Sequence, residues 1–168
     1  PPRRGRELLD HPGKPVARGA PLAFARLRLR QPKEVLVHVG AGTGLVGRED
    51  EIIQVLDRLA GTRLLTVTGP AGVGKTRFAV ELAQRLVGRY GDRRWMIDLS
   101  TLSDERAVDA VIAGTIRVQP RAGMNPLESV TDHLRTGPAL LVVDNCEHLA
   151  WAVAHSIASI LRSCPDVT

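Results

Sequence analysis

The eight residues Gly69-Pro-Ala-Gly-Val-Gly-Lys-Thr76 constrain this 168-residue chain more than any other feature. They match G-x-x-x-x-G-K-[ST] at every fixed position, between a run typical of a strand and a run typical of an amphipathic helix. Glycines let the backbone turn its N–H groups inward around phosphate oxygens, and the positive N-terminus of the following helix points to the same place. The pattern therefore predicts a phosphate-binding turn.

Two side chains of this turn are expected to carry its chemistry. The ammonium of Lys75 would reach the β- and γ-phosphates of a nucleotide, and the hydroxyl of Thr76 would face Mg²⁺. The alternative is an ordinary glycine-rich turn between a strand and a helix. The residues expected to contact the nucleotide in this segment are Gly69, Pro70, Ala71, Gly72, Val73, Gly74, Lys75, Thr76 and Arg77.

A second motif is the apolar run 139–143, which is followed by Asp144. An acid at the carboxyl end of a buried strand fits a Walker B motif, in which Asp144 would hold Mg²⁺ through water. Its alternative is a strand-end acid in a turn. Glu147 is the next carboxylate, and two roles stay open for it: it polarises an attacking water, or it caps the helix expected near Leu149.

Strands that alternate with helices predict an α/β fold with a parallel sheet. The two motifs make this a three-layer αβα P-loop NTPase, and the helix, strand and two helical segments between Lys75 and Asp144 resemble the spacing of the additional-strand class. The run 139–143 is apolar enough to be buried on both faces. A helix after the turn is expected to close at Gly88, Ser103 is expected to cap another, and Asn125 begins a capping box. The other expected strands lie at 24–30, 34–39, 64–68 and 95–99, and helices at 49–60, 108–116 and 149–162.

The net charge of +5 is unevenly distributed along the chain. Residues 1–44 carry nine basic and three acidic side chains and six of the 11 prolines, whereas residues 45–168 carry 14 basic and 15 acidic ones. We therefore expect a basic, largely irregular arm or linker over 1–44, with a hinge at 40–44, and a nucleotide-binding domain over 45–168. A nucleic-acid-binding arm is the alternative for 1–44, although Phe24 is its only aromatic residue.

Other classes of protein fit poorly. Two cysteines cannot build a disulfide framework, so a reduced, cytoplasmic protein is expected. Apolar runs such as 139–143 are too short to span a bilayer, and no apolar signal segment is present, so no membrane partner is expected.

Three segments together resemble the nucleotide-binding domain of the STAND ATPases, most closely the NB-ARC-like domain of large bacterial LuxR- or SARP-type transcriptional regulators. They are Leu45-Val-Gly-Arg-Glu49, the phosphate-binding turn, and Leu141-Val-Val-Asp-Asn-Cys-Glu-His-Leu149. The resemblance covers about 45–168 and implies ATP or ADP and Mg²⁺ as ligands. It implies that Val46, Gly47 and Arg48 lie near adenine and ribose, and that Asp144 completes the metal site.

The sequence departs from this pattern in three ways. An Asn-Leu-Pro segment does not precede the Gly-Arg-Glu element, and Asn145 stands where the additional-strand class usually has a catalytic Glu. The sequence also ends where the family's sensor-1 strand, with its γ-phosphate arginine, would begin. That strand normally lies between the P-loop and Walker B strands, so we expect an open gap there and slow or absent hydrolysis.

Three functions follow as hypotheses. The first is an ATP/ADP-dependent switch in a signalling or transcriptional regulator, whose partners are the regulator's other domains or subunits and which reaches DNA only through other domains. The second is an autonomous AAA-type ATPase or phosphotransferase. The third is nucleic-acid binding through residues 1–44.

Overall fold

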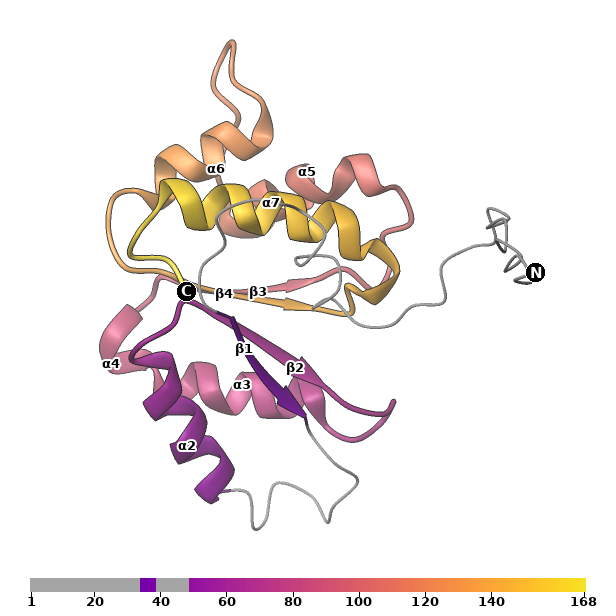
Figure 1. The fold of residues 1–168 in the computed structure, drawn as a ribbon. Coiled ribbons are helices and arrows are strands. Elements are labelled where there is room, and N and C mark those ends of the chain that lie inside the picture. Colours follow the sequence, from indigo (N-terminus) through magenta and orange to yellow (C-terminus); the bar gives the residue numbers. More distant parts are fainter. Residues whose placement is uncertain (1–33, 39–48) are drawn as a thin grey trace, which may run out of the picture.

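The computed structural model describes residues 34–38 and 49–168, in which strands and helices alternate (Figure 1). The strands are β1 (Glu34–His38), β2 (Leu64–Thr68), β3 (Arg94–Asp98) and β4 (Leu140–Asp144). The α-helices are α2 (Glu49–Leu59), α3 (Lys75–Arg85), α4 (Val87–Tyr90), α5 (Val108–Ile116), α6 (Pro126–Leu134) and α7 (Ala150–Ser163). Two 3₁₀ turns, η1 (Glu105–Ala107) and η2 (Glu147–Leu149), precede α5 and α7.

The strands form two parallel pairs. β1 pairs with β2 in a register that runs from Glu34 opposite Leu64 to His38 opposite Thr68. β3 pairs with β4, and this register ends with Asp98 opposite Asp144. The parallel α/β architecture predicted from the sequence is confirmed, and the carboxyl ends of β3 and β4 lie side by side.

Helices lie on both sides of the strands (Figure 1). Helices α5, α6 and α7 cover β3 and β4 and share with them the larger apolar core, in which Ile97, Ile112 and Ile160 are fully buried. Helices α2 and α3 form a smaller core around Phe78 and Leu82. Because α3 contacts both β2 and β4, it connects the two halves of the fold.

Three helix boundaries test the local sequence signals. The capping box at Asn125 is confirmed: its side chain accepts from the Glu128 N–H at 2.8 Å, and the Glu128 carboxylate accepts from the Asn125 N–H at 2.8 Å. The cap expected at Ser103 is wrong, since Asp104 accepts the N–H of Arg106 instead. The stop expected at Gly88 is also wrong, because that glycine lies inside α4, which ends at Gly91 with a positive φ of 53°.

The expectation that β4 is buried on both faces holds for only part of the strand. Ala139 and Leu140 are buried, but residues 141–144 are half-buried. The reason is that β3 occupies one edge of β4, whereas β4 and β2 are not paired with each other.

The strand expected at 34–39 is present as β1. The strand expected at 24–30 and the hinge at 40–44 lie outside the described residues. Within the described residues, no helix combines the length and the apolar character needed to cross a membrane.

Candidate functional site

The glycine-rich turn joins the end of β2 to the start of α3. Gly72 and Gly74 have positive φ angles of 75° and 91°, which side-chain-bearing residues rarely adopt. A Cβ added at either position would meet nothing within 4 Å, so the glycines are required by the backbone and not by crowding. The N-cap of α3 is Gly74 itself, and no side chain caps this helix end. The first N–H groups of α3 therefore have no side-chain cap at this helix end, as a phosphate-binding helix N-terminus needs.

Lys75 is the first residue of α3 and folds back across the turn. Its Nζ donates to the carbonyl oxygens of Gly69 at 3.1 Å and Pro70 at 3.0 Å. The ammonium group thus lies over the loop whose glycines turn the backbone, and the positive charge and the helix N-terminus lie together.

Thr76 and Asp144 meet although they are 68 residues apart. The Thr76 hydroxyl donates to Asp144 Oδ2 at 2.5 Å, which joins the start of α3 to the end of β4. A hydroxyl and a carboxylate oxygen are hard donors of the kind that Mg²⁺ prefers, so this donor pair fits the expected ion. In the described part of the chain, no group of three or more His, Cys, Asp or Glu side chains offers another metal site.

Two residues outside the predicted site set lie beside Asp144: Asn145 in the turn after β4, and Asp98 at the end of β3. Asn145 has a left-handed backbone with φ of 52°, and its N–H donates to Asp144 Oδ1 at 2.9 Å. Its side-chain Nδ2 donates to Asp98 Oδ1, also at 2.9 Å. Hydrogen bonds lower the pKa of the Asp98 carboxyl. The one from the Asn145 side chain has the largest effect, and another comes from the Ser100 N–H. A sequence signal existed, since β3 and β4 both end in an Asp after an apolar pair.

The other predicted site residues occupy varied positions. Glu147 is exposed in the first turn of η2, and neither η2 nor α7 has a side-chain cap, so the capping alternative for Glu147 is wrong. Arg77, Pro70 and Ala71 are exposed around the turn, whereas Val73 packs against the core of α2 and α3. The predicted nucleotide contacts Val46, Gly47 and Arg48 lie outside the described residues.

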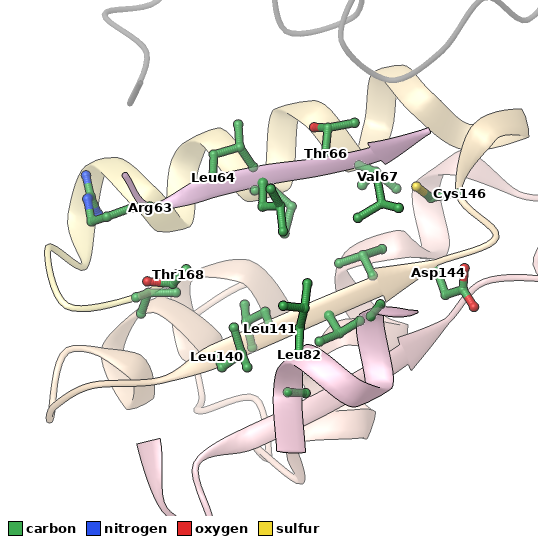
Figure 2. A pocket seen from close by; sticks show the side chains of 18 of the residues that line it. Arg63, Leu64, Thr66, Val67, Leu82, Leu140, Leu141, Asp144, Cys146 and Thr168 are labelled. Carbon is green, nitrogen blue, oxygen red and sulfur yellow. The ribbon is translucent and has the colours of Figure 1, made fainter. Parts of the chain in front are cut away.

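A cavity of about 220 Å³ separates β2 from β4 (Figure 2). Apolar side chains of both strands and of α7 line most of it, with Lys75 and Asp144 among the polar lining residues. Residues 167–168 enter it alongside β4, because Leu141 N–H donates to Thr168 O and Thr168 N–H donates to Ala139 O, each at 2.9 Å. The expected gap between the two motif-bearing strands is therefore present.

Comparisons with known proteins agree with this architecture. A family model described as an AAA domain matches residues 58–167. An uncharacterized protein of Mycobacterium tuberculosis is 35% identical over 126 residues, which are 75% of this chain and 32% of that protein. A Mycobacterium bovis protein named "Putative HTH-type transcriptional regulator" is 33% identical over 110 residues, which are 66% of this chain and 12% of that protein. No solved structure matches the chain.

The chain thus spans about a third of the first relative and a far smaller part of the second. The family model covers well over half of the chain, including the glycine-rich turn and the end of β4. A parallel α/β fold with a lysine-bearing phosphate turn beside a strand-end aspartate is the arrangement of P-loop proteins. This chain belongs to the AAA domain family.

Proposed function

We propose that residues 45–168 bind ATP and ADP with Mg²⁺ and act as a nucleotide-dependent switch in a signalling or transcriptional regulator. The observation that carries the proposal is the 2.5 Å contact between the Thr76 hydroxyl and Asp144. It joins the two motifs at one point, although nothing in their local sequences requires them to meet.

Each residue of the site has a distinct role in this proposal. The N–H groups of the turn and of the start of α3 bind the phosphates. The Lys75 ammonium, which donates to the Gly69 and Pro70 carbonyls, turns to the phosphate oxygens instead. Thr76 and Asp144 hold Mg²⁺, which neutralises phosphate charge when bound. Arg77 adds charge beside the turn. In this proposal Val46, Gly47 and Arg48 lie near adenine and ribose, as the resemblance to STAND ATPases implies.

A switch is favoured over rapid turnover by the residue that follows Asp144. That residue is Asn145, whose amide has no basic group to accept a proton from water. Glu147 is the nearest carboxylate along the chain and is the proposed group that polarises water. We therefore expect slow or absent hydrolysis, with the nucleotide state biasing the arrangement of neighbouring domains.

The proposed setting is a cytoplasmic multidomain regulator of the STAND class, with an NB-ARC-like domain as in LuxR- or SARP-type regulators. Support comes from the relative named as an HTH-type transcriptional regulator, of which this chain covers 12%. In this proposal the basic segment 1–44 is a linker apart from β1, which pairs with β2, and contact with DNA belongs to other domains.

Calorimetric titration of the 168-residue chain with Mg-ATP, Mg-ADP and Mg-GTP tests the proposal. We expect the adenine nucleotides to bind and Lys75→Ala to lose at least tenfold in affinity, because it removes the cation facing the phosphates. Lys14→Ala is the matched control, since it removes the same charge outside 45–168. Equal nucleotide binding by the original chain, Lys75→Ala and Lys14→Ala would refute the proposal, and so would the absence of binding by all of them. Transfer of the γ-phosphoryl group from ATP to an added acceptor, with ADP formed only when that acceptor is present, would support the phosphotransferase alternative instead.

A further inference from the structure

The proposed metal carboxylate is held by two donors that come from different parts of the fold. Asp144 Oδ2 accepts from the Thr76 hydroxyl, and Oδ1 accepts from the N–H of Asn145. The first donor belongs to the phosphate turn, whereas the second depends on the backbone of the turn that follows β4. Any residue that fixes this turn therefore fixes the direction in which the Asp144 carboxylate points.

The backbone conformation of the turn at Asn145 is energetically unfavourable. A φ of 52° in a residue with a side chain is unfavourable by about 1 kcal/mol, so neighbouring contacts must compensate for it. Asparagine is one of the residues that tolerate this region best, and its side chain finds a partner in Asp98, 2.9 Å from Nδ2.

Asp98 is itself well placed to anchor that side chain. It stands opposite Asp144 in the parallel register, and the backbone ladder continues past it, because Leu99 N–H donates to the Asp144 carbonyl at 3.1 Å. The Ser100 N–H also donates to Asp98 Oδ1 at 2.9 Å, which holds the carboxylate toward Asn145. Strand β3 and the Ser100 N–H thus hold the Asp98 carboxylate in position, and this carboxylate holds the Asn145 side chain in the turn after β4.

We propose that Asp98 is a positioning residue that acts through Asn145 to orient the Asp144 carboxylate toward the Mg²⁺ site. This inference deepens the proposed function and rests on it for the role of Mg²⁺. Asp98 does not contact the ion or the nucleotide in this arrangement. Its role is to hold the left-handed turn, so that Asp144 keeps one oxygen on the Asn145 N–H and leaves the other directed at Thr76.

The first test needs no nucleotide. Amide hydrogen exchange, read by NMR on the 168-residue chain, reports whether the Asn145 N–H stays bonded to Asp144. We expect Asp98→Ala to speed this exchange about tenfold, the usual effect of losing one hydrogen bond to a charged partner. Asp98→Asn keeps a side-chain carbonyl acceptor and should restore most of the protection. Asp104→Ala is the matched control, because Asp104 is another exposed aspartate that accepts a backbone N–H.

The second test measures the affinity for ADP with excess Mg²⁺ and with EDTA. Asp98→Ala and Asn145→Gly should each reduce the gain in affinity due to Mg²⁺ about fivefold, while binding in EDTA stays within twofold of the original chain. Glycine is chosen because it accepts the left-handed backbone and removes only the amide. The double variant should lose no more than either single variant, since both break the same contact.

The outcomes separate this inference from the function on which it rests. Unchanged Asn145 exchange and an unchanged Mg²⁺ gain in Asp98→Ala, matching Asp104→Ala, would overturn the positioning role even if nucleotide binds. A chain that binds no nucleotide would refute the proposed function, whereas accelerated exchange in Asp98→Ala would still support the anchoring of the Asp144 turn. Additive losses in the double variant would mean that the two side chains act separately.

Discussion

Replacing Gly74 with alanine should destabilise the protein by about 1–2 kcal/mol through backbone strain alone. Gly74 has φ of 91° and ψ of 25°, a left-handed conformation that a Cβ makes unfavourable. An added methyl would meet no heavy atom within 4 Å, so no steric clash with neighbours contributes to the loss. The prediction therefore isolates one cause, the conformation that the phosphate turn imposes.

Gly114 provides a matched control for the same chemical change. It lies in α5 with an ordinary helical backbone, and an added Cβ there also meets nothing within 4 Å. Alanine is favoured over glycine in a helix, so Gly114→Ala should stabilise the protein by about 0.5–1 kcal/mol. The two variants should thus change stability with opposite signs and differ by about 1.5–3 kcal/mol.

Urea unfolding followed by circular dichroism measures both variants against the original chain. The predicted result is a lower midpoint for Gly74→Ala and a higher one for Gly114→Ala, with equal m-values. The same sign and size for both substitutions would refute the reasoning, because it would mean that the left-handed turn is not populated in the folded protein. We also expect Gly74→Ala to weaken nucleotide binding, since it disturbs the N–H groups of the turn.

Three further predictions concern other parts of the fold. Arg63→Ala should destabilise the protein by about 1–3 kcal/mol in urea unfolding, because the guanidinium donates to Leu161 O at 2.9 Å and Cys164 O at 3.0 Å at the end of α7; an unchanged midpoint would contradict this. Arg117→Gly should stabilise by about 0.5–1 kcal/mol, since Arg117 ends α5 at φ of 61°, and a loss of stability would argue against the left-handed cap. Burial raises the pKa of the Cys146 thiol, so its alkylation by iodoacetamide, followed by mass spectrometry, should be slower at pH 8 than that of free cysteine. The alkylation rate should increase only at higher pH, and a rate equal to that of free cysteine at pH 8 would refute the prediction.

Local signals in the sequence predicted local structure well. Strand β2 has the predicted bounds, since an apolar β-rich run is followed directly by the glycines of the turn. The capping box at Asn125 was predictable because its residues interact within four positions. Ser103 was expected as a cap, but the neighbouring Asp104 has the extended backbone of an N-cap and accepts the Arg106 N–H, which residue preferences alone do not reveal.

Features that depend on contacts distant in sequence were less predictable. The half-burial of β4 follows from the edge that faces β2, where only residues 167–168 pair with its start, and an apolar run such as 139–143 does not reveal this. Gly88 was expected to end a helix, but a glycine can also lie within a helix, and here Gly91 has the positive φ. Periodicity predicts which secondary structure a segment prefers, but it does not show which other segments pack against it.

The candidate site likewise contains residues that local motifs predict and a residue that only tertiary contacts reveal. The pattern of the turn was sufficient to select Lys75 and Thr76, and the acid after an apolar strand selected Asp144. Asp98 was not selected, because its relevance appears only when the register places it opposite Asp144 and Asn145 reaches across to it.

The most direct measurement of the central claim is a double-mutant cycle between Thr76 and Asp144 on the affinity for Mg-ADP. Thr76→Ala and Asp144→Ala should each weaken binding at least tenfold in Mg²⁺, with Thr62→Ala, another threonine near a helix end, as the control. If the two side chains hold one ion, the double variant should lose less than the sum of the single losses by about 1 kcal/mol or more. Losses that add within about 0.5 kcal/mol, or single variants that bind Mg-ADP like Thr62→Ala, would contradict the claim that the two motifs form one magnesium–nucleotide site.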